Sequence, residues 1–392
     1  MTTTSHNKRG RLPVSIAYFA ALSVFGSISA AWGPALPSLA GQMQTNLRTI
    51  GLIFTIIGFG FFLASSTGAR IYDRVPGNPV MACGLFVMAA VSFIVPVIPT
   101  FWLLTLLLLL LGFAQGLVVV GANTLLVWEN QDNVGPWMNG MNFFHGIGAL
   151  LAPIIVAQAL VLSGEITWAF RILALLLSLA GIYLLIVPSP TMPEMAEKND
   201  QGNRSYFLVA VIGLLLMLYV GAERSFGSWL YTYSLALYPL TEITAGYLTS
   251  AFWGAITIGR LLAIPVAARV SSRKMLLVTF PGGLLSIGVI LTNSASLPVL
   301  WICSISLGIF MASIFPSLVD FANQQMKLSG RITGMLVSAV AIGSMIFPWA
   351  SGQVFERISP HATMALVFVL VLIGTVIYYS IAFKRRAKTL PD

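Results

Sequence analysis

Charged side chains are scarce in this sequence. They make up 8% of its 392 residues, whereas hydrophobic residues make up 57%. A soluble protein of this size carries about 25% charged residues, and no water-soluble fold could bury so large an apolar fraction. The shortage of charge therefore excludes soluble enzymes and nucleic-acid-binding proteins, and the net charge of +9 needs another explanation.

Cysteine and histidine are also rare, with two and three copies respectively. Cys83 and Cys303 lie in different apolar runs, and neither shows the spacing of a metal or redox site. The sequence contains no nucleophile–base spacing, no phosphate-binding loop and no cluster of metal ligands. We therefore expect neither enzymatic activity nor a bound metal or cofactor.

Long apolar runs are abundant in the sequence. A helix needs about 20 residues to cross the hydrocarbon core of a membrane. Twelve runs reach about that length, which predicts an all-α membrane protein with both termini on one side. The runs cover residues 12–38, 49–69, 78–98, 101–128, 134–162, 167–188, 205–236, 243–268, 273–292, 296–319, 330–354 and 358–383.

The basic residues are distributed unevenly around these runs. Sixteen of the 21 Lys and Arg residues lie in the two tails and the even-numbered connections, and three lie in the odd-numbered connections. Basic residues accumulate on the cytoplasmic side of membrane proteins, so we predict that both termini are cytoplasmic. The positive charge thus reflects topology and implies no nucleic-acid partner. The short connections on the other side suit a bacterial inner membrane.

A polar stretch at residues 189–204 divides the chain into two six-helix halves, 1–188 and 205–392. At a constant offset of 195 residues, several glycine, proline and polar positions of the halves coincide, among them Gly148 with Gly343. A 6+6 pseudo-repeat is typical of major facilitator transporters, which bind their solute near the membrane midplane between the halves.

Three segments carry a resemblance to known families. Ala69-Arg70-Ile71-Tyr72-Asp73-Arg74 resembles the Gly-x-x-x-Asp-Arg signature of the major facilitator superfamily, with Ala69 in place of glycine. The segments 121–153, which includes Asn142-Phe-Phe-His-Gly-Ile-Gly, and 219–233, which begins Tyr-Val-Gly-Ala-Glu, resemble the sodium-dependent glucose transporter branch, a relative of the fucose–proton symporters. The resemblance implies symport of a sugar or similar polyol with a proton or sodium ion. We expect a monomer.

Glu223 is the only one of the twelve acidic residues that lies well inside a predicted span. A carboxylate at midspan costs roughly 2.5–3.5 kcal/mol, so such residues are usually functional. We predict that Glu223 couples transport to the cation; a structural acid satisfied by hydroxyls or Arg224 is the alternative. Arg260 and His145 are further candidates for coupling. Helix rise places Glu223 and Arg260 at depths about 13 Å apart, which favours contact through water or solute. Arg224 points about 100° away from Glu223 and is expected to pair elsewhere.

A sugar site needs hydrogen-bonding side chains and an aromatic surface for the apolar face of the ring. The candidate solute-binding residues within the spans are Gln115, Asn123, Asn142, His145, Trp229, Tyr233 and Trp253. Each has an alternative: His145 could pack between helices, and aromatic side chains in spans often face lipid. Trp229 and Tyr233 follow Glu223 on one helix and could instead form an outer gate.

Charges at the predicted cytoplasmic ends are candidate gating residues. Acids after the fourth run and bases after the eighth are expected to meet across the halves and close the cytoplasmic side; solvated surface charges are the alternative. The candidates are Asp73, Arg74, Glu129, Asp132, Arg269 and Arg273. Two other functions stay open: proton-coupled efflux of drugs or amphiphiles, and lipid translocation.

Overall fold

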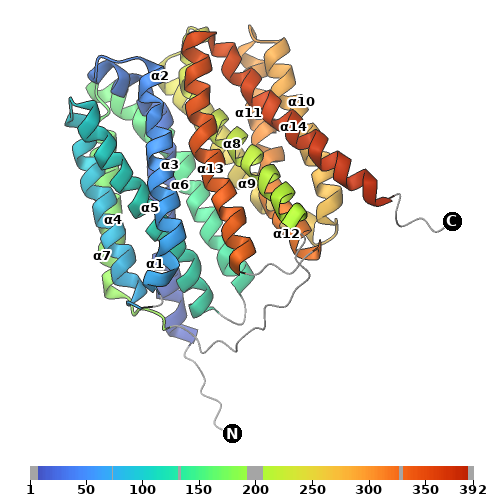
Figure 1. The fold of residues 1–392 in the computed structure, drawn as a ribbon. Coiled ribbons are helices and arrows are strands. Elements are labelled where there is room, and N and C mark those ends of the chain that lie inside the picture. Colours follow the sequence, from blue (N-terminus) through green and yellow to red (C-terminus); the bar gives the residue numbers. More distant parts are fainter. Residues whose placement is uncertain (1–7, 73, 131–133, 192–205, 326–329, 387–392) are drawn as a thin grey trace, which may run out of the picture.

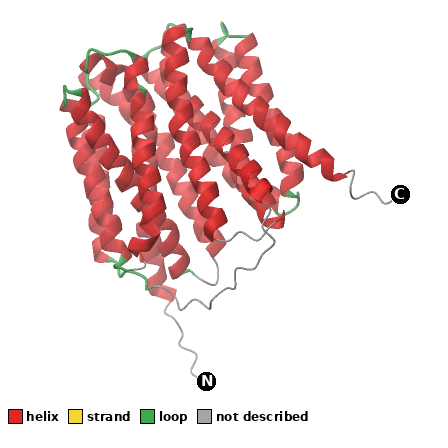
Figure 2. Cartoon of the chain, in the orientation of Figure 1, coloured by secondary structure: helices red, strands yellow, loops and turns green. Residues whose placement is uncertain are grey.

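The computed structural model describes residues 8–72, 74–130, 134–191, 206–325 and 330–386. Every regular element in these ranges is helical (Figure 2). The first group of helices is α1 (Lys8–Gln42), α2 (Leu47–Ile50), α3 (Leu52–Tyr72), α4 (Gly77–Ile94), η1 (Val95–Val97), α5 (Phe101–Glu129), α6 (Val134–Ser163) and α7 (Thr167–Ile186). The second group is α8 (Tyr206–Leu237), α9 (Glu242–Ala267), α10 (Ser272–Thr292), α11 (Leu297–Ala312), α12 (Ile314–Gln325), α13 (Gly330–Arg357) and α14 (Pro360–Arg386).

Twelve spans in the described ranges are long and apolar enough to cross a membrane. The predicted all-α fold with twelve spans is therefore confirmed. The tenth span, Leu297–Gln325, differs most from its predicted run of 296–319. It consists of α11 and α12, which meet at Ser313, and α12 continues through polar residues because several of them line a cavity.

The helices form two bundles that lie side by side (Figure 1). Within the first bundle, α1–α7, the helix α1 packs on α6 and α3 packs on α5; within the second, α8–α14, the helix α8 packs on α13 and α9 on α11. The two bundles touch through α1 and α8, α3 and α13, and α6 and α9. The predicted linker 189–204 lies mostly outside the described residues, so the boundaries of the halves stay a prediction.

Glycines allow the central helices of each bundle to approach closely. A Cβ atom at Gly148 of α6 would collide with the Ser23 carbonyl oxygen of α1. A Cβ atom at Gly343 of α13 would collide in the same way with the Met217 carbonyl oxygen of α8. Gly148 and Gly343 are a pair aligned by the 195-residue offset, so they occupy corresponding packing positions. Because the two backbones touch at these positions, each pair of helices is held in a fixed register.

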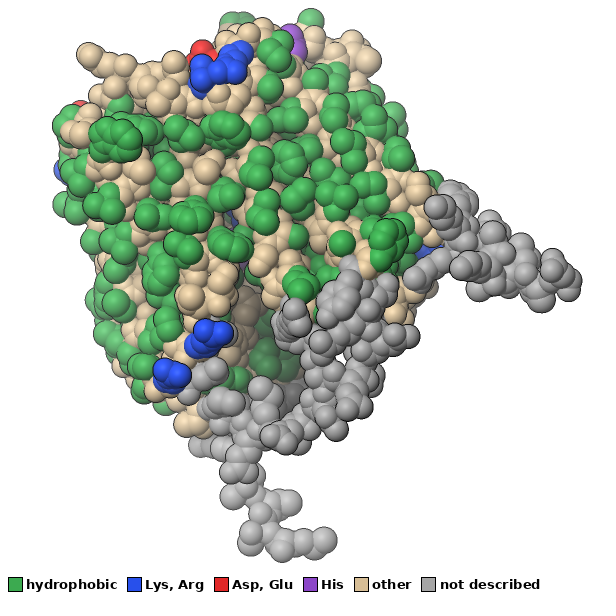
Figure 3. Space-filling model, in the orientation of Figure 1, with side chains coloured by type: hydrophobic (Ala, Val, Ile, Leu, Met, Phe, Trp, Pro, Cys, Tyr) green, Lys and Arg blue, Asp and Glu red, His purple; other side chains and the backbone are tan. Residues whose placement is uncertain are grey.

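Both α1 and α14 reach the same end of the molecule, which we call the terminal end: α1 begins there and α14 runs toward it from the other end (Figure 1). Hydrophobic side chains cover the middle of the visible surface, and Lys and Arg side chains gather nearer its ends (Figure 3). This distribution suits a protein surrounded by lipid. Which side of the membrane the terminal end faces stays a prediction.

Candidate functional site

A cavity of about 1040 Å³ lies between the two bundles. Helices α1, α3, α5 and α6 line it from one side, and α8, α9, α10, α12 and α13 line it from the other. Its lining runs from Trp32 and Pro348 to Asn139, Ser272 and Asn323, which lie near helix ends at the terminal end. A hollow is visible at this end in Figure 3. The cavity is therefore open toward the terminal end.

The opposite end is closed by hydrogen bonds between the bundles. The Leu47 backbone N–H of α2 donates to Glu356 Oε1 of α13 at 3.0 Å. Arg48 Nε donates to Gln353 Oε1 at 2.7 Å, and Gln353 Nε2 donates back to the Arg48 carbonyl oxygen at 3.2 Å. We call this group, Leu47, Arg48, Gln353 and Glu356, the seal. Its polar contacts are exposed and weak enough to break during a conformational change.

Trp229 lies directly beneath the seal. Its side chain is fully buried, its Nε1 donates to the Pro348 carbonyl oxygen at 2.8 Å, and its ring lies 5.3 Å from that of Phe355. Gly51 and Gly352 leave room for the indole, since a Cβ at Gly352 would come within 2.8 Å of it. Trp229 is thus outside the cavity lining, and it fills the closed end.

Removing the Arg48 side chain is expected to weaken the seal. The exposed contact contributes about 0.5–1 kcal/mol, so Arg48→Ala should shift the ratio of conformations two- to fivefold away from the one described here. The measurement is thiol labelling from each side at Ser29→Cys, a cavity position, in a background lacking Cys83 and Cys303. Arg357→Ala, at the same end but not in the seal, is the control, and an equal shift in both variants would contradict the assignment.

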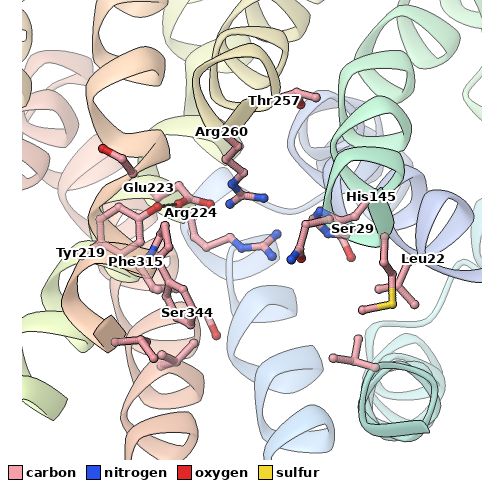
Figure 4. A pocket seen from close by; sticks show the side chains of 18 of the residues that line it. Leu22, Ser29, His145, Tyr219, Glu223, Arg224, Thr257, Arg260, Phe315 and Ser344 are labelled. Carbon is pink, nitrogen blue, oxygen red and sulfur yellow. Dashed lines mark hydrogen bonds between the residues drawn. The ribbon is translucent and has the colours of Figure 1, made fainter. Parts of the chain in front are cut away.

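A carboxylate and two guanidinium groups meet in the middle of the cavity (Figure 4). Glu223 is only 6% exposed, and its Oε2 accepts a hydrogen bond from the Tyr219 hydroxyl one helical turn earlier. Residues four apart share one face of a helix, so α8 presents this pair together. The Arg260 guanidinium of α9 faces the same Tyr219 hydroxyl.

Glu223 and Arg260 come together more closely than their predicted depths suggested. The difference of about 13 Å assumed two straight helices measured from their ends, whereas both side chains converge on Tyr219. Within the described residues, no ion pair shorter than 4.0 Å connects Glu223 to Arg260. Tyr219 is hydrogen-bonded to Glu223 and lies close to Arg260, and it was not among the site residues predicted from the sequence.

Arg224 follows Glu223 on α8. It lines the cavity, and its guanidinium carbon lies 5.8 Å from the centre of the Trp253 ring. Figure 4 shows the guanidinium reaching from α8 toward Ser29 and His145 of the first bundle. The contact with Trp253 is a partner other than Glu223, and the cavity borders enough of α8 to include both residues. Trp253 is buried behind Arg224 and does not line the cavity.

The first bundle contributes a wall of neutral polar side chains. The predicted residues Gln115, Asn123, Asn142 and His145 all line the cavity. Asn123 Nδ2 donates to the Val119 carbonyl oxygen of its own helix at 2.8 Å, and the His145 ring lies 5.4 Å from the Phe25 ring. The sequence therefore predicted this wall from residue type alone.

Two buried donors on this wall have no protein partner among the described residues. Gln115 is 4% exposed and Trp32 is 2% exposed, and neither Gln115 Nε2 nor Trp32 Nε1 makes a hydrogen bond there. Trp32 lines the cavity but was not among the predicted solute-binding residues, since aromatic side chains are common in spans. Both nitrogen atoms are covered by neighbouring atoms, so their side chains would have to move before an acceptor in the cavity could satisfy them.

Tyr233 does not face the cavity. It is fully buried, and its hydroxyl lies 3.3 Å from His361 Nδ1 of α14. Like Trp229 and Trp253, it belongs to the packing of the second bundle. Sequence reasoning could not separate such residues from cavity-lining ones, because both kinds lie in equally apolar helices.

The predicted gating residues lie at the open terminal end or outside the described residues. Arg74 and Arg269 are exposed, and Glu129 ends α5. Arg273 donates to the Ala382 carbonyl oxygen within the second bundle. Asp73 and Asp132 are outside the described residues. Contacts between the gating residues of the two bundles would form in a conformation in which the terminal end is closed. These contacts stay a prediction.

The mouth of the cavity carries one further carboxylate. Asp320 of α12 accepts hydrogen bonds from Ser272, the first residue of α10, and from Gln324 at 2.8 Å. Among the described residues, no group of three or more His, Cys, Asp or Glu side chains could hold a metal ion. The polar and charged side chains that line the cavity can bind a solute reversibly through hydrogen bonds and charge.

Comparison with known proteins agrees with this geometry. The sequence model of the Major Facilitator Superfamily matches residues 16–348. The chain is 24% identical to sodium-dependent glucose transporter 1 of Danio rerio, over 95% of this chain and 69% of that protein. It is 25% identical to sodium-dependent glucose transporter 1A of Mus musculus, over 95% and 96% of the two chains. A crystal structure of the nucleoside transporter NupG shares the fold, with a TM-score of 0.73, 17% identity, and coverage of 97% of this chain and 100% of that one.

Proposed function

Because this chain belongs to the major facilitator superfamily, we propose that it is a cation-coupled symporter of a sugar or another small polyhydroxylated solute. The protein is a multi-pass membrane transporter and not an enzyme. Its similarity to proteins named as sodium-dependent glucose transporters supports the solute class. We further propose that it works as a monomer in a bacterial inner membrane, with both termini in the cytoplasm.

The observation that carries the proposal is a polar cavity between two bundles, open at one end and sealed at the other. Rocking of two bundles around a central site exchanges the open and closed ends in transporters of this build. The bundles touch at the sealed end through exposed hydrogen bonds and close glycine contacts. These contacts are local, so the bundles can separate there without losing their own cores.

The polar wall and its aromatic neighbours support a polyhydroxylated solute. Amide and imidazole groups can both donate and accept hydrogen bonds, which suits hydroxyl groups. Phe25 and Trp32 line the same side of the cavity and can cover the apolar face of a sugar ring. The ring of a nucleoside sugar would fit the same description, so uridine belongs among the solutes to be tested.

Glu223 supports coupling to a cation. A buried carboxylate within a span is costly unless it is used, and Glu223 lies across the cavity from the polar wall of the first bundle, opposite His145 (Figure 4). Both a proton and a sodium ion can neutralise a carboxylate. The names of the relatives favour sodium, and the lone carboxylate with its Tyr219 hydroxyl supports a proton equally well.

Efflux of drugs or amphiphiles and lipid translocation are the alternatives from the sequence. The two arginines and four amide or imidazole side chains make the centre of the cavity more polar than such solutes require. Stimulation by an opposed proton gradient would identify an efflux antiporter. Competition by lipid headgroups would identify a translocase.

The protein in liposomes is expected to exchange at least one polyhydroxylated solute without any ion gradient. Counterflow needs only binding and alternating access, so it separates transport from coupling. We would measure it with radiolabelled glucose, fucose, uridine and glucuronate, using protein-free liposomes as the control. Exchange of none of the four, together with transport of an amphiphile or lipid, would contradict the proposal.

A further inference from the structure

The charges in the centre of the cavity do not balance. Arg224 and Arg260 face it together with a single acid, Glu223. The other lining acid, Asp320, is held at the mouth by Ser272 at the start of α10. Arg260 lies seven residues before the end of α9, which is about 10 Å deeper into the membrane. Asp320 is therefore at a different level from Arg260.

Asp320 is also not among the charged groups close to Arg224. Its charged neighbours are Glu223 and Arg260, with Tyr219 beside them. Both arginines also face His145 across the cavity. The described part of the centre therefore holds two positive charges and one negative charge. An uncompensated charge within a membrane protein is costly, and stacking on Trp253 offsets only part of it.

Hydrogen-bond donors are also in excess at this site. Gln115 Nε2 and Trp32 Nε1 are buried donors without a partner among the described residues, and both side chains line the cavity opposite the arginines. Guanidinium groups have only donors as well. The two guanidinium groups that line the cavity therefore need acceptor oxygens and, while Glu223 is charged, one further negative charge.

We propose that the transported solute is a sugar acid with a single carboxylate. This inference rests on the proposed function and specifies the solute class of the same cavity. The carboxylate would accept hydrogen bonds from Arg260 and Arg224 of the second bundle, because a guanidinium matches a carboxylate in geometry and charge. The hydroxyls would reach Gln115, Asn142 and His145 of the first bundle. The solute would then connect the two bundles that must move against each other.

The charge of the solute can be tested with matched compounds that share the glucose ring. Counterflow of the wild-type protein would be measured for glucuronate, glucose, glucosamine and glucose 6-phosphate. Glucuronate is expected to half-saturate exchange at a concentration about ten- to hundredfold lower than glucose, since hydrogen bonds to charged groups contribute that much. Glucosamine is expected to bind worst, because its ammonium group is repelled.

Substitutions of the two arginines test which side chains bind the negative charge of the solute. Arg260→Gln and Arg224→Gln are each expected to reduce the preference for glucuronate over glucose to less than threefold. Arg260→Lys keeps the charge and should retain part of the preference. Arg171→Gln is the matched control, because Arg171 packs over Phe93 and Trp168 outside the cavity and should not alter it. Binding would also be followed by tryptophan fluorescence of monodisperse protein, which does not require transport.

The outcomes separate this inference from the proposed function. If the protein exchanges glucose at least as well as glucuronate, the assignment of a negatively charged solute is wrong and the proposed function is unaffected. A preference for glucose 6-phosphate over glucuronate overturns the single negative charge. An unchanged preference in both neutralised variants overturns the role of the arginines. Exchange of no polyhydroxylated solute, acidic or neutral, overturns the proposed function and this inference with it.

Discussion

Glu223→Gln is expected to exchange solute at close to the wild-type rate and to lose all gradient-driven accumulation. Glutamine has nearly the same size and can still accept a hydrogen bond from Tyr219, so the shape of the cavity is kept. An amide cannot take up a proton and binds sodium far less well than a carboxylate does. In the wild type, each tenfold ion gradient supplies about 1.4 kcal/mol, or roughly tenfold accumulation; in the variant the accumulation ratio should fall to one.

The measurement compares counterflow with uptake driven by a proton gradient and, separately, by a sodium gradient. The gradient that drives the wild type identifies the coupling ion. Glu356→Gln is the matched control, because Glu356 belongs to the exposed seal and does not line the cavity; it should still concentrate solute. If Glu223→Gln concentrates solute as well as the wild type does, the coupling group lies elsewhere.

Gly33→Val is expected to slow exchange about 5- to 150-fold while leaving the protein folded. Gly33 of α1 lies against α8, and a Cβ there would come within 2.6 Å of the Ser228 carbonyl oxygen and 2.9 Å of its Cα. This contact joins the two bundles on the sealed side of the cavity. A valine would push the bundles apart where they must close, at a cost of about 1–3 kcal/mol. That cost changes the ratio of the two conformations about 5- to 150-fold, toward the one closed at the terminal end.

Gly148→Val is the comparison, because Gly148 makes a still closer contact inside one bundle, with a Cβ only 1.8 Å from the Ser23 carbonyl oxygen. The α1–α6 contact persists in any conformation that moves the bundles as units. This variant should therefore lower the melting temperature without favouring either conformation. Labelling of Ser29→Cys from each side and thermal unfolding would distinguish the two effects. A Gly33→Val protein that labels like the wild type would contradict the role of this contact in closure.

The number and type of the helices could be predicted from the amino-acid sequence. Twelve apolar runs predict twelve spans because the hydrocarbon core imposes a length and a composition on each helix separately. The sequence also identified Glu223 and Arg260 as candidate functional residues, because charged side chains within a span are rare. The wall of Gln115, Asn123, Asn142 and His145 followed from the same argument, and all four line the cavity.

The face that each helix turns toward the cavity could not be predicted from the sequence and depends on how the helices pack. Trp229, Tyr233 and Trp253 looked like solute contacts, yet they pack at the seal, against α14 and behind Arg224. Arg224 looked displaced from Glu223, yet both line the same space. In a soluble helix the polar stripe marks the outward face, whereas a membrane helix is apolar toward both lipid and neighbours. Orientation, and with it the surplus positive charge of the cavity, therefore depends on the packing of helices that are distant in the chain.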